Sequence, residues 1–280
     1  MLDLGLLQSR SQFASRRTFE DLFKALNARK ADKKAPIAYL QSQDSNLTKA
    51  GGAGDFSPLL ADLQWADLHD GSLRTDLDWA SDALGSRPEA CNIWIGRSES
   101  VTSMHKDHYE NLFTVFRGRK TFVLYPPWES YSIEGGYSME EEDKYEVYRW
   151  KWNGQGAKQP FVLEATDLPP TPWIPIDPNL PAQHVRNHAL PGYPRSRLTL
   201  KPIHVTVEAG ETLYLPMGWY HSVIQQEDDG GIDGGEDNAI CLCVNWWYNC
   251  EMSDRETWSN LGATFGRFSR EKYGLQDRDY

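Results

Sequence analysis

The chain has 280 residues, of which 40% are hydrophobic and 12% aromatic, and it carries a formal net charge of −11 at pH 7. The hydrophobic content is that of a packed globular protein and excludes a disordered chain, while the negative charge repels nucleic-acid backbones and argues against a DNA- or RNA-binding surface. No stretch approaches the roughly 20 consecutive apolar residues of a membrane-spanning helix, so no membrane segment is expected.

The N-terminal part predicts a helix that packs on the outside of the domain. Residues 18–21 have the pattern of a helix N-cap, and apolar residues follow at helical spacing as far as the basic pair Arg29 and Lys30. The earlier apolar stretch, residues 2–7, is too short for a secretory signal. We therefore expect a cytoplasmic protein, with the nucleus left open as a second location.

Three further elements are predicted before the middle of the chain. Residues 48–57 are rich in Gly and Ala and predict a loop. Residues 76–84 predict a short helix, and residues 92–95 predict a strand. These elements lead into the most informative part of the sequence.

Two histidines and one aspartate form that informative pattern. One residue separates His105 from Asp107, and His221 follows far downstream in the run Tyr-Leu-Pro-Met-Gly-Trp-Tyr-His. Because residues i and i+2 of a strand point to the same side, His105 and Asp107 can reach one ion together with His221 from a second strand. Two imidazoles and one carboxylate are the protein ligands of non-haem Fe(II) oxygenases, which leave the remaining coordination positions open.

The His-x-Asp pair alone is a weak signal, because seven histidines in an Asp-rich chain can produce it by chance. Taken alone, His105 is more simply explained as a core histidine. A metalloprotease site at His108 and Glu110 is excluded, since the helical His-Glu-x-x-His pattern is absent and the segment is predicted as strand. The iron site therefore depends on its context.

The context is a predicted strand, a tight turn at Gly118 and a second strand that stops at Pro126. In the second strand Lys120 shares a face with Phe122 and Leu124. A lysine beside two large apolar side chains is costly to bury unless an anion meets it, and a dicarboxylate cosubstrate is such an anion. The alternative is an exposed lysine on an edge strand.

The second half of the chain predicts an irregular connection and then more strands. Residues 169–197 are rich in Pro and predict an extended excursion. Strands are expected at residues 203–207, 213–215 and 239–248, and residues 255–272 are expected to form a helix. In the last strand Cys241, Cys243 and Asn245 share a face. The cysteines lack a Cys-x-x-Cys spacing, so we expect no zinc site and no disulfide framework, and Cys241 and Cys243 are expected to be small buried apolar residues.

A set of motifs along the chain carries a family resemblance. The motifs are His105-x-Asp107, Asn111, Lys120, Pro126-Pro127, Gly-Glu-x-Leu-Tyr-Leu-Pro-x-x-Trp-x-His at 210–221 and Val-Asn-Trp-Trp-Tyr at 244–248. Together they resemble the JmjC-domain 2-oxoglutarate oxygenases. Within that family the chain is most similar to the small protein hydroxylases related to factor-inhibiting HIF, in their lysyl-hydroxylase branch. The likeness extends from about residue 19 to residue 248.

The resemblance implies a mainly β fold, a double-stranded β-helix (a jelly-roll, cupin-like JmjC barrel) with flanking helices. It implies a single JmjC domain over residues 1–280, with an N-terminal flank at 1–90, a barrel core at 91–250 and a C-terminal helical segment at 251–280. Two departures from the family pattern stand out. The chain starts later than its family usually does, which puts an upstream strand in doubt, and a Gly- and Asp-rich insertion at 227–237 is expected to lengthen a loop.

The resemblance also implies a site with two sets of residues. The Fe(II) ligands are His105, Asp107 and His221. The residues that bind 2-oxoglutarate are Lys120, Thr102, Asn111, Asn245 and Tyr39. Lys120 and Tyr39 would meet the distal carboxylate of the cosubstrate. Without the resemblance, Thr102, Asn111 and Asn245 would be explained equally well as structural hydrogen-bonding residues.

The implied activity is Fe(II)- and 2-oxoglutarate-dependent hydroxylation, with O2 consumed and succinate and CO2 released. The implied partner is a protein substrate, a developmentally regulated GTP-binding protein that is hydroxylated on a lysyl carbon. A homodimer through the C-terminal helices is left open. Three alternatives also remain: a JmjC histone lysine or arginine demethylase, a histone-tail peptidase, and a non-catalytic cupin-type metal-binding module.

Overall fold

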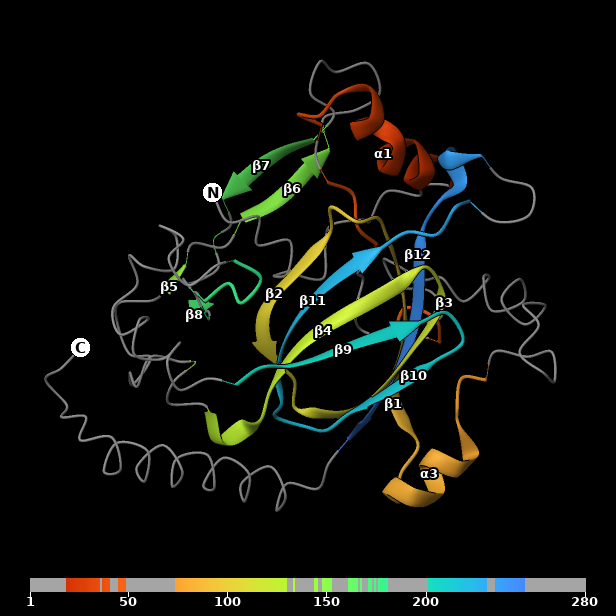
Figure 1. Ribbon diagram of the computed structural model, residues 1–280, viewed down its shortest axis with the longest axis vertical. Coiled ribbons are helices and arrows are strands. Elements are labelled where there is room, and N and C mark those ends of the chain that lie inside the picture. Colours follow the sequence, from red (N-terminus) through yellow and green to blue (C-terminus); the bar gives the residue numbers. More distant parts are fainter. Residues whose placement is uncertain are drawn as a thin grey trace, which may run out of the picture.

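The computed structural model describes residues 19–35, 37–40, 45–48, 74–129, 133, 144–145, 148–152, 161–165, 167, 171–172, 174, 176–180, 201–230 and 235–249. Its centre consists of two four-stranded sheets that lie face to face (Figure 1). Within the described part, no helix is both long enough and apolar enough to cross a membrane.

Each sheet is antiparallel and combines strands from distant parts of the chain. The first sheet has the order β1 (Pro88–Gly96), β12 (Cys241–Asn249), β3 (Tyr109–Arg117), β10 (Thr212–Leu215). The second sheet has the order β2 (Val101–Lys106), β11 (Tyr220–Gln226), β4 (Arg119–Tyr125), β9 (Ile203–Glu208). Along the chain the barrel strands alternate between the two sheets, except that β4 and β9 are neighbours in the second sheet, and this arrangement is that of a jelly roll. The prediction of a mainly β, cupin-like barrel with flanking helices is confirmed.

Side-chain alternation along the strands separates the inside of the barrel from its outer faces. Large apolar side chains from both sheets fill much of the interior, among them Phe113, Phe122, Val207 and Trp247. Phe113 and Phe122 meet edge to face with ring centroids 5.3 Å apart. Polar groups inside the barrel are therefore surrounded by a low-dielectric core.

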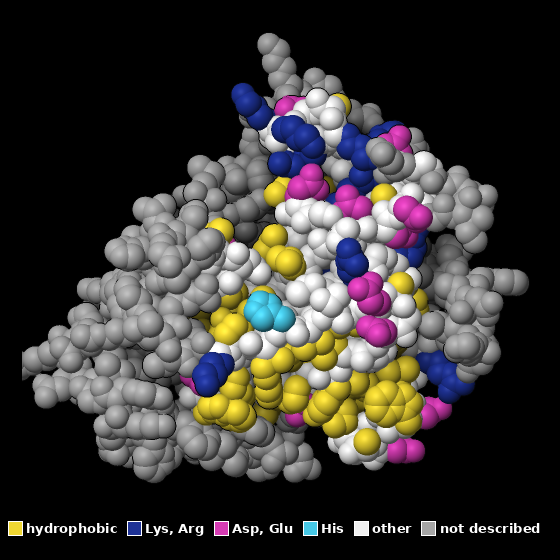
Figure 2. Space-filling model, viewed as in Figure 1, with side chains coloured by type: hydrophobic (Ala, Val, Ile, Leu, Met, Phe, Trp, Pro, Cys, Tyr) yellow, Lys and Arg dark blue, Asp and Glu magenta, His cyan; other side chains and the backbone are white. Residues whose placement is uncertain are grey.

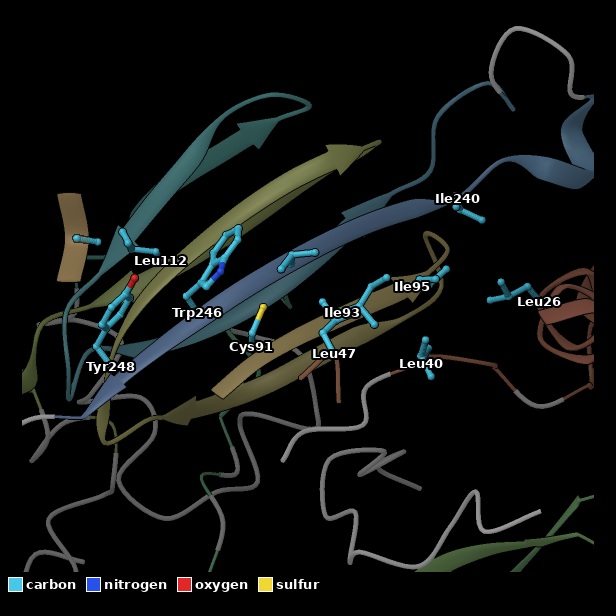
Figure 3. Packing of buried hydrophobic residues seen from close by; sticks show 12 residues of the cluster. Leu26, Leu40, Leu47, Cys91, Ile93, Ile95, Leu112, Ile240, Trp246 and Tyr248 are labelled. Atoms are coloured by element: carbon cyan, nitrogen blue, oxygen red, sulfur yellow. The ribbon is translucent and has the colours of Figure 1, made fainter. Parts of the chain in front are cut away.

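The outer face of the first sheet is buried beneath the N-terminal part of the chain (Figure 3). α1 (Phe19–Ala31) contributes Leu26, and α3 (Asp78–Leu84) contributes Ala80. Between them Leu40 pairs with Ile95 in an isolated bridge that extends the sheet beyond β1. Burying both faces of this sheet holds β1 and β12 rigidly where they contribute side chains to the interior.

The outer face of the second sheet packs against the connection between β4 and β9. Ile133, Ile174 and Ile176 cover the side chains of Val123 and Tyr220 there. The connection also contains two small two-stranded antiparallel sheets that the sequence pattern did not predict: β5 (Lys144–Tyr145) with β8 (Thr171–Pro172), and β6 (Tyr148–Trp152) with β7 (Phe161–Ala165).

The predicted turn between β3 and β4 is confirmed at Gly118, whose φ is 70°. A Cβ atom there would lie 2.3 Å from the backbone oxygen of Gln226, so only glycine fits both the conformation and the space. The two predicted N-terminal helices are also confirmed, although α3 begins at Asp78, two residues later than expected. Two short 3-10 turns complete the described elements: η1 (Pro127–Glu129) and η2 (Glu236–Asn238).

The Gly- and Asp-rich insertion is held at both ends. Arg117 donates to Asp228 with its Nε at 2.6 Å and with Nη2 at 3.1 Å. Asp237 meets Lys30 of α1 at 3.0 Å. Several predictions fall outside the described residues: the helix at 255–272, the loop after Thr48, Cys250, the helix cap at Thr18 and residues 181–197 of the proline-rich excursion.

Candidate metal centre

His105 and His221 lie directly opposite each other in the antiparallel pair β2 and β11. Their ring centroids are 4.0 Å apart. The Asp107 Oδ2 atom lies 3.9 Å from His105 Nε2 and 3.6 Å from His221 Nε2. One ligand atom from each of the three residues therefore lies within 4.8 Å of the other two, which is a separation that one metal ion can bridge. The structure thus brings the three predicted ligands together.

Backbone hydrogen bonds orient both imidazole rings. His105 Nδ1 donates to the Ser103 carbonyl at 2.8 Å, and His221 Nδ1 donates to the Trp219 carbonyl at 3.0 Å. An Nδ1 atom that carries the proton leaves Nε2 as the atom with the lone pair. In both rings Nε2 is the atom that faces Asp107, which is the orientation that a metal ligand needs.

Asp107 differs from the sequence prediction in its local structure. β2 ends at Lys106, so Asp107 is the first residue after the strand and not part of it. The Asp107 carbonyl accepts a hydrogen bond from the Gly218 backbone N–H at 2.9 Å, and Gly218 has a φ of 78°. The turn before β11 therefore holds the aspartate beside the two histidines, a contact that local sequence periodicity does not predict.

The electrostatic environment keeps His221 neutral. Burial and, to a lesser extent, the neighbouring His105 lower the pKa of His221 to about 4, while the Asp107 carboxylate opposes the shift. A neutral imidazole is the form that coordinates a metal. Two imidazoles and one carboxylate are a donor set suited to Fe(II).

Lys120 lies inside the barrel, as predicted, and its side chain is only 3% exposed. Its ammonium donates to the Tyr39 hydroxyl at 2.8 Å and lies 5.1 Å from the centre of the Phe113 ring. Burial raises the pKa of the Tyr39 phenol, so this partner carries no charge at neutral pH. Among the described residues no carboxylate forms an ion pair with Lys120, so the buried cation is suited to an anion that enters from outside.

The other predicted cosubstrate residues lie on three strands around the same interior. Asn245 on β12 donates through Nδ2 to Asn111 Oδ1 on β3 at 3.1 Å, and both side chains are buried. Thr102 on β2 is the register partner of Val223 on β11, next to a bulge in that pairing. The roles of these residues in binding a cosubstrate stay predictions.

Two residues of this interior were missed by the sequence analysis. Trp94 of β1 donates through its indole N–H to Asn245 Oδ1 at 2.8 Å, and its ring lies 6.2 Å from that of Tyr39. Gly96 leaves the space that Tyr39 occupies, because a Cβ atom there would be 2.6 Å from Tyr39 Cδ2. Alternation along β1 could have placed Trp94 on the inner face, but its partner across the sheet follows only from strand pairing.

The prediction that Cys241 and Cys243 are small buried residues is confirmed. Cys91, Cys241 and Cys243 are free and buried. The Sγ atoms of Cys241 and Cys243 are 3.7 Å apart on the inner face of β12. The two thiols lie within hydrogen-bonding distance of each other and form no disulfide.

Two partly exposed tryptophans contact each other near the turn before β11. Trp128 of η1 and Trp219, which precedes β11, meet edge to face with centroids 6.3 Å apart, and Trp128 is 43% exposed. The exposed surface also includes Ile203 and Tyr214. Figure 2 shows apolar side chains gathered along the lower edge of the described surface.

Comparisons with known proteins agree with this architecture. The model of the cupin-like domain family matches residues 6–254. The "Lysine-specific demethylase JMJ32" of Arabidopsis thaliana is 35% identical over 66% of this chain and 49% of its own length. The "Bifunctional peptidase and (3S)-lysyl hydroxylase JMJD7" of Homo sapiens is 33% identical over 80% of this chain and 57% of its own length.

The name of a more distant relative includes both iron and 2-oxoglutarate. The "2-oxoglutarate and iron-dependent oxygenase JMJD4" of Gallus gallus is 25% identical over 56% of this chain and 28% of its own length. The chain spans only about half the length of the first two curated relatives that it matches. These similarities therefore identify the domain, while the activity of the whole protein requires a separate argument.

Proposed function

The chain belongs to the cupin-like domain family, among the JmjC proteins. On this premise we propose that it is an Fe(II)- and 2-oxoglutarate-dependent dioxygenase that hydroxylates a lysyl side chain of a protein substrate. One observation carries the proposal. The metal-ligand cluster of His105, Asp107 and His221 shares its barrel with a buried lysine for which the described residues supply no carboxylate partner.

The residues present fit both the metal and the cosubstrate. His105, Asp107 and His221 would hold Fe(II) through two Nε2 atoms and one carboxylate oxygen. Lys120 and the Tyr39 hydroxyl would hold the distal carboxylate of 2-oxoglutarate. Because that carboxylate would neutralise an ammonium already removed from water, the pocket favours a dicarboxylate over a neutral molecule of similar size.

Bound iron and 2-oxoglutarate would supply the oxidising power, as O2 is reduced, the keto acid is converted to succinate and CO2, and an unactivated C–H bond is hydroxylated. The protein's own residues then have three tasks. The backbone hydrogen bonds of His105 and His221 hold both Nε2 atoms toward Asp107, where they would bind the metal. Lys120 would fix the cosubstrate, and the apolar side chains around Phe113 and Phe122 would exclude water.

The proposed substrate is inferred from relatives, and it is more specific than the proposed type of reaction. JMJD7 is named a (3S)-lysyl hydroxylase, which supports a lysyl carbon as the target. The resemblance suggests a developmentally regulated GTP-binding protein as the partner, and we propose that the two meet in the cytoplasm. A basic substrate segment also suits the formal net charge of −11, since opposite charges accelerate encounter.

Mass spectrometry of a lysine-containing peptide tests the proposed activity directly. The peptide would be incubated with the purified chain, Fe(II), 2-oxoglutarate and ascorbate in air, with succinate measured in parallel. A gain of one oxygen on lysine together with succinate supports hydroxylation. If succinate is released but no peptide from a GTP-binding protein gains oxygen, the lysyl hydroxylase proposal is rejected. The chain would then still be supported as a 2-oxoglutarate oxygenase with another substrate.

Two relatives motivate second candidates. JMJ32 is named a lysine-specific demethylase, and the same oxidant acting on an N-methyl group would remove that methyl as formaldehyde. JMJD7 is also named a peptidase, which would cut the peptide backbone without forming succinate. A non-catalytic cupin-type module would bind metal, change no peptide and form no succinate. The same assay, repeated with a peptide whose lysine is N-methylated, separates all four outcomes by the mass and number of the products.

A further inference from the structure

A hydrogen-bonded chain of side chains crosses the inner face of the first sheet, from β1 through β12 to β3. Trp94 Nε1 donates to Asn245 Oδ1 at 2.8 Å, and Asn245 Nδ2 donates to Asn111 Oδ1 at 3.1 Å. The three side chains belong to residues that are 8%, 1% and 5% exposed, respectively. Asn111 and Asn245 are the asparagines that the resemblance assigns to the cosubstrate site, whereas it assigns no role to Trp94.

The chain has only one possible direction. An indole N–H can donate a hydrogen bond but cannot accept one, so the Asn245 atom that meets Trp94 must be its carbonyl oxygen. The Asn245 amide nitrogen then points to the other side, where it donates to Asn111. Since Asn111 accepts with its oxygen, its own amide nitrogen is turned away from Asn245 and remains a donor.

Asn92 supports the same direction from a second position. Its Oδ1 accepts hydrogen bonds from the backbone N–H groups of Ser45 at 2.8 Å and Asn46 at 3.3 Å. Its Nδ2 is thereby directed at the Asn245 oxygen, 3.4 Å away. Two donors, one indole and one amide, therefore converge on one carbonyl oxygen, and the shorter contact is that of Trp94.

We infer that Trp94 is a positioning residue for the cosubstrate: its indole N–H fixes the Asn245 amide, which engages the Asn111 oxygen and leaves the Asn111 NH2 group as a donor toward an anion in the barrel. This inference rests on the proposed function, because it needs 2-oxoglutarate in the pocket. The physical reason is that a carboxamide is equally able to donate or to accept. If Asn245 rotated by half a turn, carbonyl oxygens would replace donors and would repel a carboxylate.

Trp94 also links this chain to the ammonium end of the pocket. Its ring lies 6.2 Å from that of Tyr39, which in turn accepts the Lys120 hydrogen bond. The same side chain thus borders both the cationic and the amide sides of the interior. A change that removes the indole N–H but keeps an aromatic ring would separate the hydrogen-bonding role from packing.

The test is the dissociation constant of 2-oxoglutarate for the Mn(II)-loaded protein, measured by calorimetry in the absence of O2. Trp94→Phe is expected to weaken 2-oxoglutarate binding by roughly three- to thirtyfold, the effect of one lost hydrogen bond to a buried oxygen. The affinity for Mn(II) alone should stay within a factor of two of wild type, because Trp94 touches no metal ligand in the described structure.

Trp246 provides a matched control on the outer face of β12, next to Asn245. Its indole N–H donates to the Arg74 carbonyl at 2.9 Å, and its side chain belongs to the outer core. Trp246→Phe therefore removes an equivalent hydrogen bond outside the barrel and should leave the 2-oxoglutarate dissociation constant unchanged. Equal weakening by both variants would show a general loss of structure and overturn the inference.

A double-mutant cycle separates orientation from packing. In an Asn245→Ala background, Trp94→Phe should change 2-oxoglutarate binding by less than twofold, because no amide is left to orient. The same fold loss in both backgrounds would reject the role of Trp94. Should Trp94→Phe fail to fold, Asn92→Ala gives the second measurement, with an expected loss of roughly two- to fivefold.

The two proposals fail in different ways in this experiment. Wild-type protein that binds Mn(II) but not 2-oxoglutarate rejects the proposed function, and the inference on Trp94 falls with it. Wild-type protein that binds 2-oxoglutarate with an affinity that Trp94→Phe leaves unchanged rejects only the inference.

Discussion

His105 and His221 are register partners across β2 and β11, and this pairing places their rings 4.0 Å apart inside the barrel. The metal centre is thus a property of strand register. A shift of one residue in the pairing would turn one histidine to the outer face, where Val123 and Tyr220 lie beneath Ile174. The apolar cover on that face opposes such a shift, so the packing of the sheet protects the geometry of the site.

Asp107→Ala should abolish turnover and leave the fold intact. Asp107 follows β2 and contributes a half-buried carboxylate to the cluster, while the hydrogen bond from Gly218 uses its backbone and survives the change. We expect Fe(II) affinity to fall by more than about 100-fold, because even outer-shell changes cost 10- to 100-fold. Metal titration and thermal unfolding of the metal-free protein provide the two measurements.

The adjacent exposed histidine gives a control for that variant. His108 lies one residue beyond Asp107 but outside the metal-ligand cluster of the described residues. His108→Ala should keep wild-type Fe(II) affinity. Turnover that persists in Asp107→Ala would show that the carboxylate is not a ligand.

Lys120→Met should weaken 2-oxoglutarate binding by about 10- to 100-fold, as expected for loss of a charged hydrogen-bond partner. The unfolding free energy without cosubstrate should rise by about 1 kcal/mol, since an ammonium with no carboxylate partner in the described barrel is replaced by an apolar side chain. Calorimetry and denaturant unfolding measure the two effects separately.

Lys106 is the matched control for Lys120. It is an exposed lysine that also donates to a tyrosine hydroxyl, that of Tyr220, at 3.0 Å. Lys106→Met should not alter 2-oxoglutarate affinity. An unchanged affinity in Lys120→Met would mean that the buried ammonium serves the fold and not an anion.

Gly96→Ala should displace Tyr39, one of the residues predicted to bind the cosubstrate. The added Cβ would lie 2.2 Å from Gln225 Nε2 and 2.6 Å from Tyr39 Cδ2, so Tyr39 must move away from its 2.8 Å hydrogen bond to Lys120. We expect 2-oxoglutarate affinity to fall by about three- to tenfold and stability to fall by about 1–3 kcal/mol.

Gly235 is an alternative position for the same substitution, because a Cβ atom there would meet nothing within 4 Å. Gly235→Ala should leave both quantities unchanged. A Gly96→Ala protein with full cosubstrate affinity would show that the position of Tyr39 does not matter for binding.

The metal-free protein should lose stability in mild acid through His221. Burial lowers the pKa of this imidazole to about 4 in the folded protein, below its usual value of 6.5. The unfolded chain therefore binds more protons between these two pH values, and the unfolding free energy decreases as pH falls from about 6.5 to about 4. The total effect is at most about 3 kcal/mol.

Denaturant unfolding in the presence of a chelator measures this dependence. In His221→Gln the titrating group is absent, so the difference in unfolding free energy between wild type and variant should shrink as the pH is lowered and level off below about pH 4. A difference that stays constant from pH 7 to pH 4 would contradict a buried neutral His221.

Much of the fold and of the site was predictable from local patterns. The strand, Gly118 turn and strand around residues 109–125 follow from alternation and a glycine with positive φ, both of which are short-range features. The sequence could predict that Lys120 lies inside the barrel, because Lys120 is on the same face of its strand as Phe122 and Leu124. The identities of the three metal ligands could also be proposed, since their residue types and spacing match a known coordination chemistry.

The sequence by itself therefore determined which side chains are available and which face of its strand each one occupies, because these properties depend on neighbours along the chain. Only the tertiary structure decided that Gly218 holds Asp107 beyond the end of β2, that Tyr39 reaches Lys120 past Gly96, and that Trp94 donates to Asn245. The last two contacts join residues that are 81 and 151 positions apart along the chain. Their formation depends on how the sheets pair and pack, which no local periodicity encodes.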